Sequence, residues 1–432
     1  MSRDLMERLL AGRLPDPDGA CTLSVPTRKV VIAPSLAGQE ASLLADLGLG
    51  RRLAVVSDPT TRAVLGARVV AGLAGWDVSE IVLERAPQPD DETMARVRAA
   101  TAGAEALLAV GSGTINDLCK YAAFLDRKPY AVFGTAPSMN GYTSVNAAIT
   151  EHGHKMSLPA AAPRGVFLDL GVLAAAPARM IRSGLGDSIC RPTAQADWLL
   201  AHLLLGHPYR RLPFVLLEAD ETKLLASAGS LTAGDTGAIE LLARTLILSG
   251  FGMTICGGSY PASQGEHLIS HYIDMMGDPA WPQSFHGEHI AVTALTMARL
   301  QEAMTAGEAP VLSPTRLTRA ELERHFGPEL GASCWAAFSR KAMDGPGTAA
   351  LNAKLAKEWP EIRAVLKDAM RPSAEMARAL AAAGAPVSPR DIHLPEAFYR
   401  QAVRHAREIR DRYTFLDLAA ESGRLDSLAE AA

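Results

Sequence analysis

The sequence has few cysteines and no excess of basic charge, and each scarcity excludes a class of protein. Its 5 cysteines are scattered over 432 residues and form no CxxC pair. A disulfide framework or a cysteine-based zinc site is therefore not expected, and a reducing compartment suits the chain. The formal net charge of -4 argues against a nucleic-acid-binding protein, which normally carries a basic excess.

Long hydrophobic runs are also lacking. We find no stretch that approaches the roughly 18 to 20 apolar residues needed to span a bilayer. The N-terminal segment MSRDLMERLLAGRL mixes charged with apolar residues, which is typical of a surface amphipathic helix and not of a signal peptide. We expect a soluble, cytoplasmic protein with neither a membrane nor a nucleic acid as its partner.

Two kinds of periodicity divide the chain, which at 432 residues is long enough for two domains. In the first part, short continuous apolar runs alternate with helical stretches, as in a parallel sheet covered on both faces. These runs are residues 29–33, 53–57, 80–84, 106–110, 130–134 and 166–170. Later residues form mainly helical patterns, such as 237–250, 287–304 and 396–413. We predict an α/β, Rossmann-like dinucleotide-binding domain over 1–175 and an all-α domain over 176–432.

A glycine-containing segment follows the apolar run at 106–110. It reads Gly111-Ser112-Gly113-Thr114-Ile115-Asn116-Asp117, and a helix is expected next. Glycines let the backbone approach an anion closely, and a helix N-terminus offers free N–H groups. The same pattern is also typical of a tight strand-to-helix turn. The Lys-Ser/Thr pair of a P-loop NTPase is missing, but the strand-loop-helix setting favours phosphate binding.

Two other strand ends carry polar residues. Asp58 ends the run at 53–57, where a carboxylate can accept hydrogen bonds from a ribose hydroxyl. Because Pro59 follows, Asp58 is also typical of a helix N-cap. The run at 130–134 ends in Thr135-Ala136-Pro137-Ser138-Met139-Asn140-Gly141, a turn that suits a cofactor contact or an ordinary polar loop.

The helical half contains a candidate metal site. His267 and His271 lie four residues apart in GEHLISH, His286 follows in HGEH, and Asp187 precedes them in SGLGDSIC. One carboxylate and two neutral imidazoles suit Zn²⁺, Fe²⁺ or Ni²⁺. Such a metal acts as a Lewis acid and lowers the pKa of a bound hydroxyl.

Each histidine also has a structural alternative. A single histidine in a helix is more often a surface or hydrogen-bonded residue than a metal ligand. We expect His289, three residues after His286, to be exposed. His152 and His154, in TEHGHK, resemble surface residues of a hairpin. Spacing alone therefore makes the metal site a hypothesis.

Five motifs together resemble one family. GSGTIND, TAPSMNGYTS, GLGDSICR, GEHLISHY and HGEHIAV occur in the order and approximate spacing of bacterial and archaeal sn-glycerol-1-phosphate dehydrogenases. That family belongs to the iron-containing alcohol dehydrogenase and dehydroquinate synthase-like superfamily, and the C-terminal IRDRYTFLDLA resembles its bacterial branch. The resemblance extends from about Lys29 onward. It implies a dehydroquinate synthase-like two-domain architecture, with metal and substrate in the second domain, and a homodimer.

The resemblance also implies a reaction and a role for each motif. The family reduces dihydroxyacetone phosphate to sn-glycerol 1-phosphate, with NAD or NADP and one divalent metal. Asp187, His267 and His286 are the implied metal ligands, and Asp187, His271 and Asn140 face the substrate. The implied cofactor contacts are Asp58, Gly111, Gly113, Thr114, Ile115, Asn116, Asp117, Thr135, Ala136, Pro137, Ser138 and Ser144.

Two positions depart from the family pattern. Asn140 stands where the family usually carries Asp, and it cannot accept a proton as a carboxylate does. His289 stands where Lys or Gln is common. Asn140 leaves open a different hydroxy-phosphate, phosphonate or polyol substrate; a dehydroquinate synthase-like cyclase that uses NAD transiently and an impaired binding protein are further alternatives. NAD versus NADP also stays open, because Asp58 repels a 2′-phosphate whereas Arg62, one turn onward, attracts it.

Overall fold

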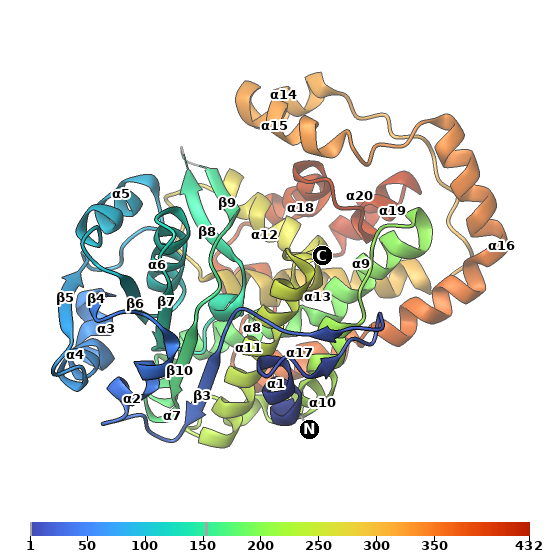
Figure 1. Cartoon of the computed structure of the whole chain (residues 1–432). Helices are drawn as coiled ribbons and strands as arrows, with labels where there is room; N and C mark the ends of the chain where they lie inside the picture. The colour runs from blue at the N-terminus through green and yellow to red at the C-terminus, as the bar shows by residue number, and fades with distance from the viewer. Residues whose placement is uncertain (1, 152–153) are drawn as a thin grey trace. The chain divides into compact units, whose positions relative to one another are not determined.

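The computed structural model describes residues 2–151 and 154–432, which divide into two compact units (Figure 1). The N-terminal unit comprises Met1–Ser188, Arg210–Ser259 and Ala382–Gly384, and the C-terminal unit comprises Ile189–Tyr209, Tyr260–Ala381 and Ala385–Ala432. The predicted boundary after residue 175 does not coincide with this division. Two helices from the second half, α10 (Leu212–Ala226) and α11 (Thr236–Cys256), pack within the N-terminal unit.

A parallel six-stranded sheet organises the N-terminal unit, in the order β3-β10-β7-β6-β4-β5. Its strands are β3 (Lys29–Ala33), β4 (Arg52–Ser57), β5 (Asp77–Val82), β6 (Ala106–Gly111), β7 (Tyr130–Gly134) and β10 (Gly165–Asp169). The predicted α/β fold is confirmed. β3 and β7 coincide with their predicted runs, and the ends of β4, β6 and β10 differ from prediction by one residue.

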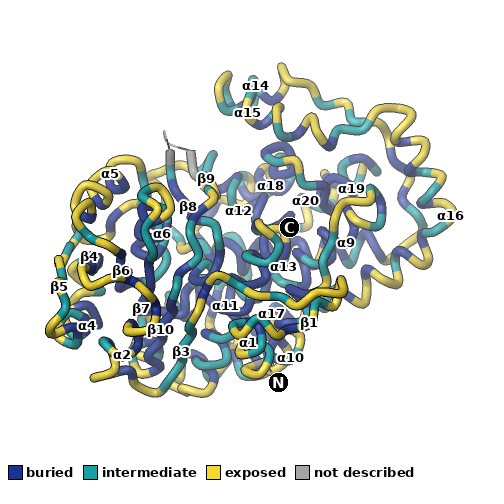
Figure 2. The backbone as a smooth tube through the Cα atoms, viewed as in Figure 1, coloured by how far each residue is buried: buried dark blue, intermediate teal, exposed yellow. Residues whose placement is uncertain are grey.

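The central strands are buried on both faces (Figure 2). Val55 of β4 and Leu108 of β6 join one core cluster with Leu44 of α2 (Glu40–Leu44) and Val69 of α4 (Ala67–Gly72). Their chain neighbours, such as Val56, point to the opposite face of the sheet and are equally buried. The continuous apolar runs are therefore strands covered from both sides.

β5 is the exception. The pattern predicts residues 80–84, whereas the strand begins three residues earlier, at Asp77. β5 lies at the edge of the sheet, where it pairs with β4, and its side chains are exposed or half-buried. An exposed edge strand needs no apolar run, so hydrophobicity alone misplaces it.

Helices and two short antiparallel sheets complete this unit. The helices include α1 (Ser2–Leu10), α3 (Pro59–Thr61), α5 (Asp91–Ala100), α6 (Gly113–Leu125), α7 (Leu170–Ala174) and α8 (Ala178–Ile189, which ends at the unit boundary). β1 (Leu14–Pro15) pairs with β2 (Thr22–Leu23), and β8 (Asn146–Glu151) pairs with β9 (His154–Pro159). The predicted amphipathic helix is α1, which buries Met6 and Leu9. β8 and β9 form the expected hairpin, but His152 and the side chain of His154 lie outside the described residues.

α11 corrects the expectation that no stretch approaches the length of a membrane span. By length and composition it is apolar enough to cross a bilayer, with a mean hydropathy of 1.5 in an 18-residue window. However, 61% of that window is buried inside the protein. Arg244 on α11 also donates to Asp220 of α10 at 2.7 Å. α11 is thus a core helix of the N-terminal unit.

The C-terminal unit is helical. Its helices are α9 (Arg191–Leu205), α12 (Gly265–Met276), α13 (His286–Thr305), α14 (Arg319–Phe326), α15 (Pro328–Phe338), α16 (Gly345–Ala369), most of α17 (Ser373–Ala383), α18 (Glu396–His405), α19 (Phe415–Glu421) and α20 (Leu425–Glu430). One core cluster joins residues from α9, α12, α13, α16, α18 and α19. The predicted helix at 396–413 is shorter: α18 ends at His405, and a 3₁₀ turn, Ala406–Ile409, follows.

Candidate functional site

The sheet of the N-terminal unit has a switch point between β4 and β6. From β4 the chain continues to β5 at the edge, and it then returns to place β6 on the other side of β4. Open α/β sheets bind ligands beyond the carboxyl ends of such strands. Asp58 follows β4, Gly111 ends β6, and Thr135 follows β7. The backbone N–H of Thr135 donates to the Gly111 carbonyl at 3.1 Å, so the topology brings the three predicted cofactor segments to one edge.

The glycine segment is a shorter loop than predicted, because Thr114 to Asp117 already form the first turn of α6. A Cβ on Gly111 would lie 2.6 Å from the Ile115 Cβ, so glycine is required for the helix to start this close to the strand. Ser112 is the N-cap, and within the described structure its side chain makes no capping hydrogen bond. The N–H groups of this turn therefore suit an anionic acceptor.

Asp58 caps α3, which is the structural alternative that its sequence context suggested. Its Oδ1 accepts the Thr61 N–H at 2.7 Å, and the Asp58 N–H donates to the Thr61 hydroxyl at 3.0 Å. A carboxylate has a second oxygen, so capping is compatible with a ribose contact. Arg62 donates to both carboxylate oxygens of Glu80, at 2.8 and 3.2 Å.

Asn116, Asp117 and Ser144 use their side chains within the protein. Asn116 Nδ2 donates to Asp117 Oδ1 at 3.0 Å, and the Ala148 N–H of β8 donates to Asp117 Oδ2 at 3.0 Å. Lys120 Nζ donates to the Ser144 hydroxyl at 3.1 Å. Lys120 is fully buried, and its burial lowers the pKa of its ammonium group. Sequence reasoning missed Lys120, a lysine within an apolar helical stretch that fastens α6 to the turn after β7.

The turn after β7 packs directly on α8. Thr135, Ala136 and Ser138 are buried, and a Cβ on Gly184 of α8 would lie 1.7 Å from the Pro137 carbonyl oxygen. Next in the turn, the backbone N–H of Asn140 donates to Asp187 Oδ2 at 2.7 Å. Two of the three predicted catalytic residues are therefore in contact within the N-terminal unit.

In the C-terminal unit, α12 and α13 bring the three predicted histidines together. His267 Nε2 lies 3.3 Å from His286 Nε2, although the residues are 19 positions apart. The His271 ring, one turn along α12, has its centroid 6.1 Å from the His267 ring and 6.5 Å from the His286 ring. His286 is the first residue of α13.

Glu266 orients His267, and sequence reasoning missed it. Its side chain is fully buried, and its Oε1 accepts a hydrogen bond from His267 Nδ1 at 2.9 Å. Because Nδ1 then carries the proton of the neutral ring, Nε2 presents a lone pair; this tautomer follows from the hydrogen bond. The Gln264 N–H also donates to Glu266 Oε1, at 2.8 Å. The available signal was an acidic residue directly before the first histidine of HLISH.

The histidine pair fits a metal ion. Two nitrogens bound to one Zn²⁺ at about 2.0–2.1 Å with a tetrahedral angle lie about 3.3 Å apart, which matches the 3.3 Å between the two Nε2 atoms. A carboxylate behind a ligating imidazole is the usual support of such a site. Cys190, Glu266 and His267 also place ligand atoms within 4.8 Å of one another. Since His267 Nδ1 already faces Glu266, we interpret this group as support for His267.

His289 corrects a prediction, because it is 7% exposed and not a surface residue. Its Nδ1 lies 3.5 Å from Asp274 Oδ1. α13 is a core helix in which every residue from Gly287 to Ala298 is buried. The local sequence of HGEH does not reveal the tertiary packing that covers His289.

Known proteins resemble the chain in sequence and fold. Residues 31–177 match the family model described as iron-containing alcohol dehydrogenase. The chain is 28% identical to a glycerol-1-phosphate dehydrogenase (NAD(P)+) of Bacillus licheniformis, over 93% of this chain and 90% of that protein. It is 30% identical to the protein of that name from Thermococcus kodakarensis, over 63% of this chain and 77% of that protein.

A solved structure supports the same fold. The crystal structure of glycerol dehydrogenase from Schizosaccharomyces pombe superposes with a TM-score of 0.62 and 15% identity, and covers 94% of this chain and 90% of that chain. At this identity the likeness bears on the fold alone.

Proposed function

We propose, because this chain belongs to the glycerol-1-phosphate dehydrogenase family of iron-containing alcohol dehydrogenases, that it is an NAD(P)-linked, metal-dependent oxidoreductase. Its proposed reaction interconverts dihydroxyacetone phosphate and sn-glycerol 1-phosphate. One observation carries the proposal beyond family membership. Two imidazole Nε2 atoms lie at the separation of metal ligands, and a buried carboxylate sets the tautomer of one of them.

Each residue has a proposed task. Asp187, His267 and His286 hold the metal, and Asp187 lies two residues before the C-terminal unit begins. When bound, the metal polarises the substrate carbonyl and the reduced nicotinamide supplies hydride. His271 and Asn140 contact the substrate, and water or a side chain supplies the proton to the product hydroxyl. Glu266 keeps His267 in the tautomer whose Nε2 can bind the metal.

The cofactor site is proposed at the carboxyl edge of β4, β6 and β7. Gly111, Gly113 and the first turn of α6 receive the pyrophosphate, and Asp58 receives the adenosine ribose. The turn from Thr135 to Ser138 lines the same edge and completes the site. Asn116, Asp117 and Ser144 act there by holding α6, this turn and β8 together.

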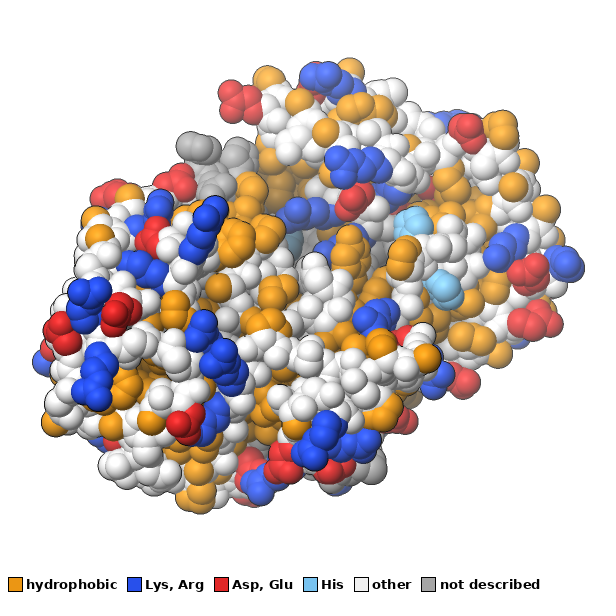
Figure 3. Space-filling view, viewed as in Figure 1, with side chains coloured by type: hydrophobic (Ala, Val, Ile, Leu, Met, Phe, Trp, Pro, Cys, Tyr) orange, Lys and Arg blue, Asp and Glu red, His pale blue; other side chains and the backbone are white. Residues whose placement is uncertain are grey.

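We further propose Zn²⁺, Ni²⁺ or Fe²⁺ as the metal, a homodimeric assembly and a cytoplasmic location. Basic and acidic side chains are interspersed over the face drawn in Figure 3, as expected for a net charge of -4. This distribution argues against a nucleic acid as the partner, and the proposed partner is a small phosphorylated substrate.

The test is NADH and NADPH oxidation by metal-reconstituted protein supplied with dihydroxyacetone phosphate. Unphosphorylated dihydroxyacetone and a chelator-treated sample serve as controls. We expect chelator-sensitive oxidation that requires the phosphate and consumes cofactor stoichiometrically. Absence of NADH and NADPH oxidation with every metal tested would overturn the proposed reaction. Turnover of a cyclisation substrate without net NADH consumption would favour the cyclase.

A second candidate substrate is another hydroxy-phosphate or a phosphonate, and Asn140 is the observation that favours it. The Asn140 side-chain nitrogen is buried and has no hydrogen-bond partner among the described residues, so it can donate to a substrate group that an aspartate would repel. Asn140→Asp should raise turnover of dihydroxyacetone phosphate if this position sets specificity. Unchanged or lower turnover would remove Asn140 from that role.

A further inference from the structure

Arg62 lies one helical turn after Asp58, at the edge where the cofactor site is proposed, and it is fastened to β5. Its Nε and Nη2 donate to Oε1 and Oε2 of Glu80 at 2.8 and 3.2 Å. Pairing of β4 with β5 makes this possible, because it places Glu80 beside Val55. One side of the planar guanidinium, formed by Nε and Nη2, is thus hydrogen-bonded to a single carboxylate.

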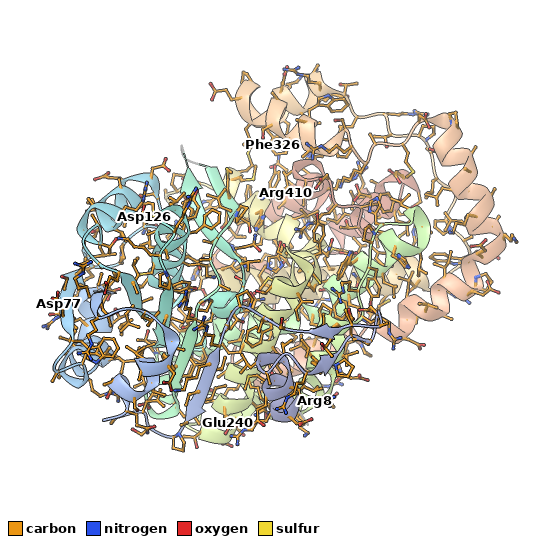
Figure 4. All side chains as sticks on the ribbon, in the orientation of Figure 1. Arg8, Asp77, Asp126, Glu240, Phe326 and Arg410 are labelled. Carbon is orange, nitrogen blue, oxygen red and sulfur yellow. The ribbon has the colours of Figure 1, made fainter. Side chains whose placement is uncertain are left out.

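The position of Glu80 along β5 decides where the guanidinium lies. β5 begins at Asp77, which Figure 4 labels, and ends at Val82. Glu80 is therefore two residues, or about 7 Å, back from the carboxyl end of the strand. Asp58, by contrast, follows the last residue of β4. The Asp58 carboxylate therefore lies at the carboxyl edge of the sheet. The Arg62 guanidinium, which is bound to Glu80, lies farther back along β5.

A second arginine in this unit is also paired with a glutamate, through one nitrogen. Arg96 of α5 donates to Glu84, just beyond β5, at 2.5 Å. Arg85 is exposed and follows Glu84 in the chain. It is therefore the cation whose contribution a test must separate from that of Arg62.

We propose that the Glu80–Arg62 pair makes this chain prefer NAD(H) over NADP(H). The inference rests on the proposed cofactor site. The 2′-phosphate of NADP(H) lies on the ribose that Asp58 is proposed to bind, and an arginine close by is what normally accommodates it. Here the Asp58 carboxylate repels the phosphate, and Glu80 neutralises the Arg62 guanidinium and holds it back along β5.

The pair is partly exposed, with side-chain accessibilities of 46% for Arg62 and 27% for Glu80. An exposed ion pair holds its partners weakly and is screened by salt. The discrimination that it adds should therefore be moderate, on the order of three- to tenfold in affinity for the phosphorylated ribose. Removing the Glu80 charge should release the guanidinium for the 2′-phosphate.

Two fragments test the inference directly: 5′-AMP and 2′,5′-ADP, which differ by the 2′-phosphate. Their dissociation constants are measured by calorimetry for the full-length wild-type chain and for Glu80→Gln. The matched control is Asp126→Asn at the far end of α6 (Figure 4), which removes a carboxylate paired with Arg98 at 2.6 Å. Arg62→Ala in the Glu80→Gln background and Arg85→Ala identify the responsible cation.

We expect wild type to bind 5′-AMP more tightly than 2′,5′-ADP. Glu80→Gln should tighten 2′,5′-ADP about three- to tenfold relative to 5′-AMP, Asp126→Asn should change neither, and the added Arg62→Ala should remove the gain. The kcat/KM ratio of NADPH to NADH should shift likewise. Tight wild-type binding of 2′,5′-ADP that depends on Arg85, or an unchanged ratio in Glu80→Gln, would overturn the inference. Fragment binding without dihydroxyacetone phosphate reduction would instead count against the proposed reaction.

Discussion

Two polar clusters of the C-terminal unit are built in opposite ways. The first, the histidine cluster, consists of His267, His271, His286 and Glu266. The second, the charge network, consists of Lys341, Arg407, Tyr413, Asp417 and Glu421. In the charge network Lys341 Nζ donates to Asp417 Oδ2 at 3.0 Å and Arg407 Nε donates to Asp417 Oδ1 at 3.0 Å. The Tyr413 hydroxyl donates to Glu421 at 2.8 Å. In the histidine cluster one carboxylate supports one ring, and two Nε2 atoms face each other.

The difference separates a structural cluster from a binding cluster. Buried charges that balance one another stabilise a particular packing and need no ligand. Bringing imidazole nitrogens together costs free energy, because neutral rings attract each other only weakly. A bound cation offsets that cost. Removal of a residue should therefore affect function in the first cluster and stability in the second.

The largest effect is expected from His267→Ala. Loss of one metal ligand and of its Lewis-acid contribution, which is worth several kcal/mol, should lower kcat by about 1,000-fold or more. The folded structure should persist, because Glu266 keeps its backbone donor at Gln264. Metal content by mass spectrometry, turnover and circular dichroism measure the three quantities. His207→Ala, at an exposed histidine of the same unit, is the control; full turnover of His267→Ala would refute the metal assignment.

Asp417→Asn should have the converse effect. It leaves the Lys341 and Arg407 cations buried without their shared carboxylate, which should cost about 3–5 kcal/mol of unfolding free energy. Metal content per folded molecule should stay at the wild-type level. Urea unfolding measures the cost. The control is Asp426→Asn, at an 89% exposed side chain paired with Arg404, which should cost about 1 kcal/mol or less of unfolding free energy. Equal losses of unfolding free energy in the two variants would contradict the structural role of the charge network.

Glu266→Gln sharpens the comparison within the histidine cluster. The amide can still accept from His267 Nδ1, but without the negative charge the ring is a poorer ligand, so metal affinity should fall about 10- to 100-fold. Burial, together with the Glu266 charge, raises the pKa of Asp197 to about 8, so removing that charge should lower the pKa of Asp197. Metal-buffered titration measures the affinity, and Glu302→Gln, whose carboxylate accepts from Ser373 at 2.7 Å, is the control. Wild-type affinity in Glu266→Gln would reduce Glu266 to a structural role.

The smallest effect concerns pH. Burial, with the nearby Asp417 charge, raises the pKa of Glu421 from 4.5 to about 7. The folded state therefore holds this proton more tightly than the unfolded state does, and its contribution to stability is present below pH 4.5 and is lost as pH rises towards 7. Glu421→Gln should remove that loss, which is on the order of 1 kcal/mol between pH 6 and pH 8. Parallel stability curves for the two proteins over this interval would contradict the assignment.

The sequence located most of the sheet because its central strands are covered on both faces. Such strands must be apolar at every position, and a continuous run such as 130–134 appears as β7 without a change of boundary. β5 was misplaced because an edge strand tolerates Asp77, Ser79 and Glu80. α11 is apolar enough for a bilayer only because it lies in the core of its unit.

The candidate site was predicted in part. The spacing of His267 and His271 predicts one helix face, and the structure brings Nε2 of the predicted His286, from α13, to 3.3 Å from His267 Nε2. Neither Glu266 nor Lys120 was predicted, since each acts through a neighbour that local sequence does not reveal. His289 was expected at the surface but is buried. Polar residues at the start of a helix do not reveal what packs against that helix.

The sequence by itself determined the strand-turn-helix order, the glycine at position 111 and the residue types of a metal and nucleotide site. These depend on local sterics and on the period of apolar residues, which each segment carries alone. Only the tertiary structure decided which groups meet. It joined Arg62 to Glu80 through the pairing of β4 with β5, set Glu266 behind His267, and covered His289. Such contacts arise from packing between segments distant in the chain, and their energies depend on burial that no single segment can specify.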